Sequence, residues 1–68
     1  MEKYFVNDNA QSNGDHEVHK DGCKYLAMAH RTTYLGYFSN CRDAVIAAKR
    51  IYLKSDGCAT CSPACHTS

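Results

Sequence analysis

The 68-residue sequence contains no tryptophan, a single proline and only four glycines. It has no internal repeat or low-complexity tract, and no apolar run near the ~20 residues that a membrane-spanning helix needs. The first eight residues include no apolar run of signal-peptide length. These absences exclude a collagen-like chain and a transmembrane helix. They predict one cytoplasmic domain over residues 1–68, with no membrane partner.

The sequence also has no large excess of positive or negative charge. Eight Lys and Arg side chains stand against seven Asp and Glu side chains, and the basic ones are scattered along the chain. A protein that neutralises several nucleic-acid phosphates usually carries a basic face. Nucleic acid is therefore a disfavoured partner, and the partner is unknown. If the chain does bind nucleic acid, the expected contacts are Arg31, Arg42, Lys49 and Arg50.

So short a chain needs stabilisation beyond its hydrophobic core. Ordering it costs roughly 100 kcal/mol, and apolar burial in a domain of this size only about balances that cost. Five cysteines are present. Because disulfides are rare in a reducing compartment, a cysteine-dense cytosolic domain favours a metal site.

The residue patterns predict a small α+β fold with two or three short antiparallel strands and one main helix. Strands are expected at 4–6 and 33–38, where aromatic and β-branched residues gather. A helix is expected over 40–53, with Asn40 as its N-cap. Its predicted buried stripe consists of Ala44, Ala47, Ala48 and Ile51. Residues 16–23 are interpreted as a loop or knuckle and 55–57 as the stop of the helix.

Two short motifs have the spacing of metal-binding knuckles. Cys58 and Cys61 form C-x2-C directly after a glycine, and His19 and Cys23 form H-x3-C across another glycine. Three thiolates and one imidazole complete a closed tetrahedral Cys3His zinc site. The sequence therefore predicts one Zn²⁺ per chain, although a mononuclear iron site uses similar donors.

Other residues compete for these positions. His16 lies three residues before His19 and can replace it as the imidazole ligand, while Cys65 or His66 can replace a ligand of the second knuckle. Cys41, in the first turn of the predicted helix, is interpreted as a small buried apolar side chain. The strand aromatics are predicted to fill the core, with a base-stacking platform as the alternative. They are Tyr4, Phe5, Tyr34, Tyr37 and Phe38.

The ordered motifs resemble a known family. They are His19-x3-Cys23-x2-Leu26, an aromatic strand ending in Phe38-Ser39, an alanine-rich helix, and Cys58-x2-Cys61-x-Pro63. Over residues 4–63 this order is similar to the metal-binding domain of the Ada DNA-repair protein and its standalone relatives. The resemblance implies one tetrahedral zinc ion held by His19, Cys23, Cys58 and Cys61.

The sequence also departs from the Ada pattern. His19 stands where the repair protein has the cysteine that accepts a methyl group from a DNA phosphotriester, and the helix-turn-helix that follows in that protein is missing. Asp56-Gly57 stands before Cys58 where the family favours an aromatic, a variable residue and a proline. These departures disfavour methyl transfer.

The function predicted from the sequence is a small non-catalytic module with a structural zinc site. Four protein ligands leave no open position for water or substrate, so the chain is not expected to be an enzyme. The alternative is an Ada-like DNA-binding or methyl-acceptor domain. A third hypothesis is redox cycling of Cys58 and Cys61 with Cys65 as the resolving thiol.

Overall fold

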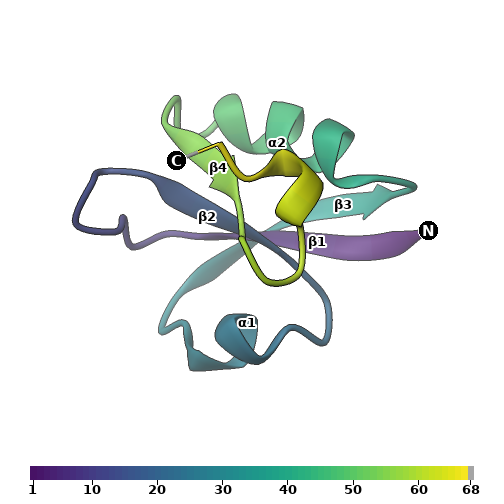
Figure 1. Cartoon of the computed structure of the whole chain (residues 1–68), viewed down its shortest axis with the longest axis horizontal. Helices are drawn as coiled ribbons and strands as arrows, with labels where there is room; N and C mark the ends of the chain where they lie inside the picture. Colours follow the sequence, from purple (N-terminus) through teal and green to yellow (C-terminus); the bar gives the residue numbers. More distant parts are fainter. Residues whose placement is uncertain (68) are drawn as a thin grey trace.

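The computed structural model describes residues 1–67 and confirms the α+β class (Figure 1). Four strands form one sheet, and a single helix of nine residues is the main helical element among the described residues. In chain order the elements are β1 (Glu2–Asn7), β2 (His16–Lys20), α1 (Lys24–Met28), β3 (Thr32–Phe38), α2 (Cys41–Lys49), β4 (Ser55–Gly57) and the 3-10 helix η1 (Pro63–Cys65).

The sheet has the strand order β3-β1-β2-β4. β1 pairs antiparallel with both β2 and β3, whereas β4 runs parallel to β2. The interpretation of 16–23 as a loop or knuckle is therefore wrong for 16–20, which form β2, and holds for the turn at 21–23. The interpretation of 55–57 as a helix stop is also wrong. Both segments are short and polar, but Val18 of β2 is fully buried and all three residues of β4 are buried. Pairing of β2 with β1 and β4, and of β4 with β2, makes these segments strands.

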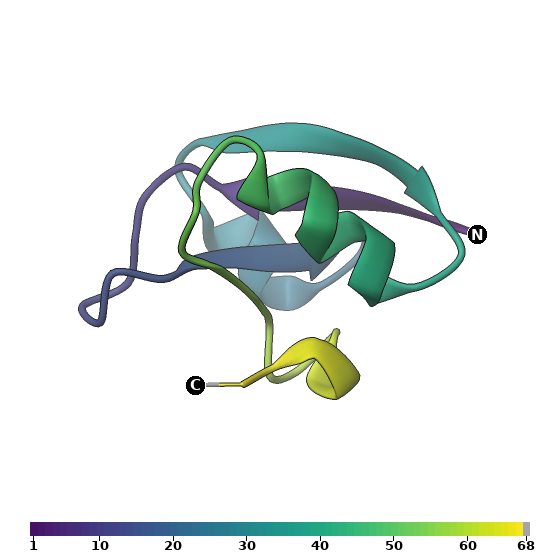
Figure 2. The ribbon, with the colours of Figure 1, turned by 90° about the horizontal axis from the view of Figure 1, so that it is seen from above.

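One face of the sheet is covered by α2, which lies across the strands when seen from above (Figure 2). Tyr4, Val6 and Val18 from the sheet form the core with Ala44 and Ala48 from the helix. The small alanines let the helix approach the strands closely. The predicted buried stripe is thus confirmed at Ala44 and Ala48.

The N-terminal end of α2 follows from local chemistry, and its C-terminal end from tertiary packing. The Asn40 side chain accepts a hydrogen bond from the Asp43 N–H at 2.9 Å, which is the predicted N-cap. The helix ends at Lys49, short of the predicted residue 53, and Ile51 is half exposed. The chain bends here so that Tyr52 packs against the core and β4 can join the sheet.

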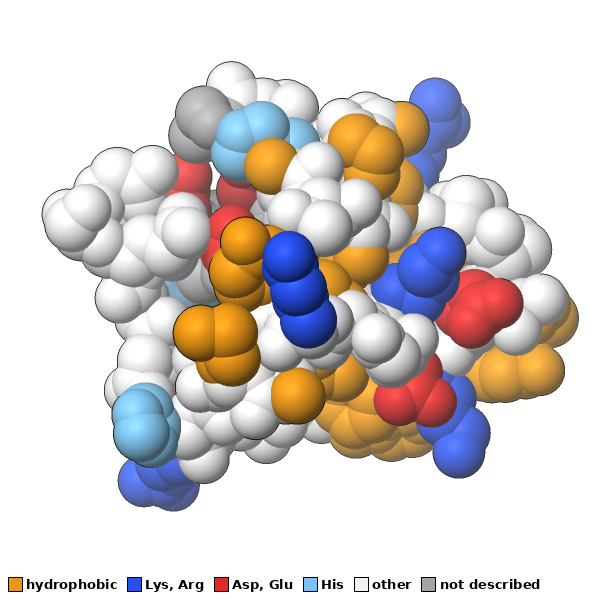
Figure 3. All heavy atoms as spheres, turned by 60° about the horizontal axis from the view of Figure 1, so that its bottom comes forward, with side chains coloured by type: hydrophobic (Ala, Val, Ile, Leu, Met, Phe, Trp, Pro, Cys, Tyr) orange, Lys and Arg blue, Asp and Glu red, His pale blue; other side chains and the backbone are white. Residues whose placement is uncertain are grey.

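The opposite face of the sheet carries aromatic side chains at the surface. Phe5 contacts Tyr34 with ring centroids 5.2 Å apart, and Tyr34 and Tyr37 are both more than half exposed. The core prediction is wrong for these two tyrosines, because their register places them on the side away from α2. Figure 3 views this side, where hydrophobic side chains reach the surface between charged ones.

A disulfide joins Cys41 at the start of α2 to Cys65 at the end of η1. The interpretation of Cys41 as only a small buried apolar residue is wrong, and Cys65 is not a free thiol. Their Cα atoms lie 6.2 Å apart, within the usual range for a disulfide.

No helix within residues 1–67 has both the length and the apolar character needed to cross a bilayer.

Candidate metal centre

The first knuckle is the turn that follows β2. The Cys23 N–H donates to the Lys20 carbonyl at 3.1 Å, and Gly22 between them has a φ of +90°, which L side chains rarely adopt. The turn brings the thiol of Cys23 beside the ring of His19, the penultimate residue of the strand.

The second knuckle follows β4 and is positioned by the parallel pairing with β2. The Cys58 N–H donates to the Val18 carbonyl at 3.0 Å, which continues the β4 ladder by one residue. The Ser62 N–H then donates to the Cys58 carbonyl at 2.8 Å and closes a turn around Cys61. The Lys20 N–H donates to the Cys61 sulfur at 3.2 Å, so the two knuckles are joined directly.

These turns bring together all four residues that the sequence predicts as ligands. The ligand atoms of His19, Cys23, Cys58 and Cys61 all lie within 4.8 Å of one another. Nδ1 of His19 is 3.7 Å from the Cys23 sulfur and 3.9 Å from the Cys61 sulfur. A tetrahedral ion with bonds of about 2.3 Å holds its ligand atoms about 3.8 Å apart. The group can therefore hold a metal ion.

The group lies mostly out of contact with solvent. The imidazole of His19 is 1% exposed, Cys23 and Cys58 are buried, and Cys61 is partly exposed. Burial lowers the pKa of His19, against the opposing effect of the nearby Glu17 carboxylate. The ring is thus held in the neutral form that donates a lone pair to a metal.

The thiols influence one another. Burial, with a smaller contribution from the neighbouring thiols, raises the pKa of Cys61 to about 11. Burial also acts to raise the pKa of Cys23, but hydrogen bonds from Cys61 and from backbone N–H groups outweigh it and lower that pKa. Thiolates this close repel one another, and a bound cation offsets such repulsion.

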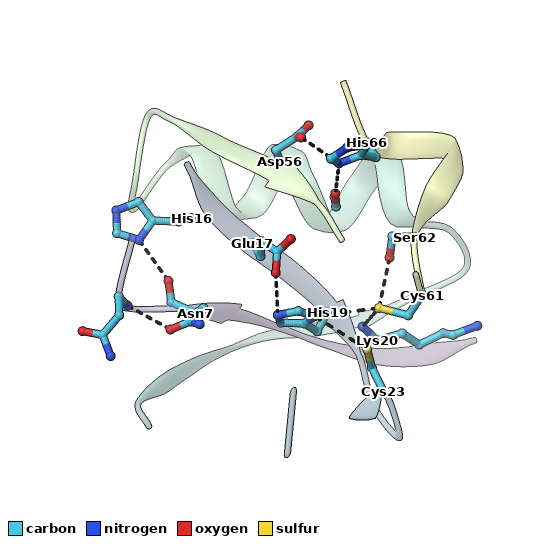
Figure 4. A network of polar contacts seen from close by, with 12 residues as sticks. Asn7, His16, Glu17, His19, Lys20, Cys23, Asp56, Cys61, Ser62 and His66 are labelled. Carbon is cyan, nitrogen blue, oxygen red and sulfur yellow. Dashed lines mark hydrogen bonds and ion pairs between the residues drawn. The ribbon is translucent and has the colours of Figure 1, made fainter. Parts of the chain in front are cut away.

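Glu17 is a site residue that the sequence interpretation missed. Its Oε1 lies 3.5 Å from Nε2 of His19, on the side of the ring opposite the sulfur atoms (Figure 4). Metal-bound histidines commonly contact a carboxylate through the second ring nitrogen. Residues two apart share a face on a strand but not in a loop. The contact between Glu17 and His19 could therefore be predicted only if 16–20 was recognised as a strand.

The alternative ligands lie elsewhere. His16 and His19 are three residues apart on β2 and so point to opposite faces. The His16 ring stacks on Tyr52 with centroids 3.8 Å apart, and its Nδ1 is 2.9 Å from the Asn7 carbonyl. Nδ1 of His66 is 3.0 Å from the Gly57 carbonyl oxygen, and Cys65 is held in its disulfide.

Comparisons with protein-family models, with curated proteins and with solved structures give no match to this chain.

Proposed function

We propose that the chain is a small non-catalytic module whose fold is stabilised by one zinc ion bound to His19, Cys23, Cys58 and Cys61. The observation that carries the proposal is the convergence of these four ligand atoms within 4.8 Å. Three soft thiolates and one imidazole are a donor set that zinc favours.

The position of the group supports a structural role. Two ligands come from β2 and the turn after it, and two from the turn after β4. Since α1, β3 and α2 lie between the two pairs in the chain, a bound ion would join the end of β2 to the turn after β4. In zinc-finger peptides such an ion contributes roughly 10–16 kcal/mol, which becomes folding free energy when the site forms only in the folded chain. A domain of 68 residues needs stabilisation of this kind.

The set of donors also supports a non-catalytic role. Four protein ligands would saturate a tetrahedral ion and leave no position for a water or substrate. The methyl-acceptor alternative is disfavoured, since the acceptor position holds a buried imidazole. Metal-bound imidazole has no free lone pair to act as a nucleophile.

A cytoplasmic location stays a prediction of the sequence.

Native mass spectrometry with elemental analysis tests the proposal. We expect one zinc per chain, and we expect Cys58→Ser and Cys61→Ser to lose it. The matched control is the double variant Cys41→Ser/Cys65→Ser, which removes two sulfur atoms outside the group and should retain one zinc. A wild-type chain that purifies without metal and takes up none, or a Cys58→Ser chain that keeps its zinc, would overturn the proposal. Bound iron would change the metal but keep the site.

Chelation provides a second readout. Because the ion would connect segments from both halves of the chain, its removal should unfold the domain cooperatively rather than loosen one end. An NMR spectrum that stays dispersed after complete chelation would show that the ion is not structural.

A further inference from the structure

The Cys41–Cys65 disulfide lies at the surface and at the start of a helix. Cys41 is the first residue of α2, directly after the N-cap Asn40, and both cysteines are only half buried. The first turn of a helix presents free N–H groups and partial positive charge, which stabilise a thiolate. Breaking the bond would therefore leave a stabilised anion on the Cys41 sulfur.

A hollow of about 270 Å³ adjoins Cys65 on one side of the disulfide. Arg42 and Lys49 contribute two cations to its lining, Val45 and Ile46 contribute apolar surface, and no acidic residue lines it. Cys41 does not line this hollow, but it lines a neighbouring one that also reaches Cys65 and includes Asp43. A small anion is thus favoured on the Cys65 side.

We propose that Cys41–Cys65 is a reversible thiol–disulfide exchange site for a small thiol that carries carboxylates, of the glutathione class. The thiolate of the small molecule attacks the Cys65 sulfur from the cationic hollow and forms a mixed disulfide. The bond between the two cysteines breaks, and its electron pair leaves on the Cys41 sulfur at the helix N-terminus. Attack on the side away from the leaving sulfur is the geometry that this exchange needs.

A second small thiol completes the reaction. Its thiolate attacks the small-molecule sulfur of the mixed disulfide and releases the Cys65 thiolate together with a small-molecule disulfide. Two small thiols are oxidised and the protein disulfide is reduced by two electrons. The two protons that the thiols lose are taken up by Cys41, Cys65 or solvent. The site lies outside the His19 group, so the proposal does not rest on metal binding.

Reduction would remove the covalent link between η1 and α2 while leaving other contacts in place. The Thr67 N–H and hydroxyl donate to the Asp56 carboxylate at 3.0 and 2.9 Å, and His66 contacts the Gly57 carbonyl. The C-terminal segment therefore keeps its attachment to β4, and the exchange can occur in the folded chain.

The first experiment locates the mixed disulfide. The wild-type chain with its disulfide intact is incubated briefly with a limiting amount of reduced glutathione, quenched with acid, alkylated and mapped by peptide mass spectrometry. We expect the trapped mixed disulfide to carry glutathione on Cys65 and the alkyl group on Cys41. Preferential modification of Cys41 would overturn the proposed direction of attack.

The second experiment tests the cationic hollow. Lys49→Gln and Arg42→Gln should each slow reduction of the disulfide by glutathione roughly threefold to tenfold, since local positive charge raises the encounter rate of anions. Reduction by 2-mercaptoethanol, whose attacking thiolate carries no carboxylate, should be slowed less. Lys24→Gln is the matched control, because Lys24 lies over Tyr25 in α1, away from both hollows. Equal slowing with both reagents, or reduction only after denaturation, would overturn the proposal.

Discussion

Glu17 and His19 share one face of β2, and the Glu17 carboxylate oxygen lies 3.5 Å from Nε2 of the His19 ring while Nδ1 faces the sulfur atoms. The carboxylate fixes which ring nitrogen points toward the ligand group. This contact makes Glu17 a positioning residue for the proposed metal ion.

Glu17→Gln is expected to lower zinc affinity roughly tenfold while the stoichiometry stays at one ion per chain, because contacts to the second nitrogen of a metal-bound histidine orient the ring and raise its basicity. Competition with a chromophoric chelator measures the change. Glu2→Gln, an exposed change on β1, is the control and should have no effect. Equal affinities for wild type and Glu17→Gln would contradict the assigned role.

Loss of the disulfide is expected to destabilise the chain. The bond joins residues 24 apart in sequence, and closing a loop of that length is worth about 3.5 kcal/mol in the chain-entropy model. Cys41→Ala, Cys65→Ala and the double variant should therefore lower the free energy of unfolding by similar amounts. Urea unfolding of the metal-loaded proteins measures this. A double variant that costs the sum of the two single variants would show that packing, rather than the bond, is responsible.

Gly57→Ala is expected to destabilise the chain by about 2 kcal/mol. A Cβ at residue 57 would lie 2.7 Å from the Cβ of Cys65 and 2.9 Å from its carbonyl carbon, so η1 would have to move away from β4. Thermal unfolding measures the effect. Ala59→Ser, at an exposed position two residues along the chain, should change stability by less than about 0.5 kcal/mol. Equal melting temperatures for Gly57→Ala and wild type would mean that η1 is not packed as described.

Asp8→Asn is expected to lower the pKa of Tyr52. The Tyr52 hydroxyl donates to Oδ1 of Asp8 at 3.0 Å, and this hydrogen bond, with some burial, raises the pKa of the phenol above its ordinary value. The stabilisation from this contact is therefore complete below about pH 10 and is lost as the pH rises through the higher pKa of the folded state.

An NMR titration of the tyrosine rings checks this expectation. Tyr4 is an internal control, because burial comes first among the causes that raise its pKa and Asp8 is not among them. A Tyr52 pKa that does not fall in Asp8→Asn would show that the Asp8 carboxylate is not its cause.

Features set by neighbours in the chain could be predicted from the sequence. The N-cap at Asn40 and the buried alanines of α2 depend on interactions within one or two helical turns. The grouping of His19, Cys23, Cys58 and Cys61 was predicted from the spacing within two knuckles, each of which is a local turn.

Only the tertiary structure decided the features that depend on pairing between distant segments. The polar stretch at 16–20 becomes a strand because β1 and β4 pair with it, and that pairing puts His19 rather than His16 on the face with the thiols. The x3 spacing to Cys23 favoured His19 over His16, and the strand pairing gives the physical reason for that choice. The register between β1 and β3 likewise exposes Tyr34 and Tyr37, although their composition favours a core.

Three of the five cysteines could be grouped from the sequence, whereas the pairing of the other two was decided by the tertiary structure. Spacing assigned Cys23, Cys58 and Cys61 to one group, but no local pattern pairs Cys41 with Cys65, which lie 24 residues apart. Their sulfur atoms meet because α2 packs on the sheet and η1 folds back beside β4, where Gly57 leaves room for Cys65. The sequence determined the residues that can bind a metal, and the packing of the helix on the sheet determined which cysteines were left to form the disulfide.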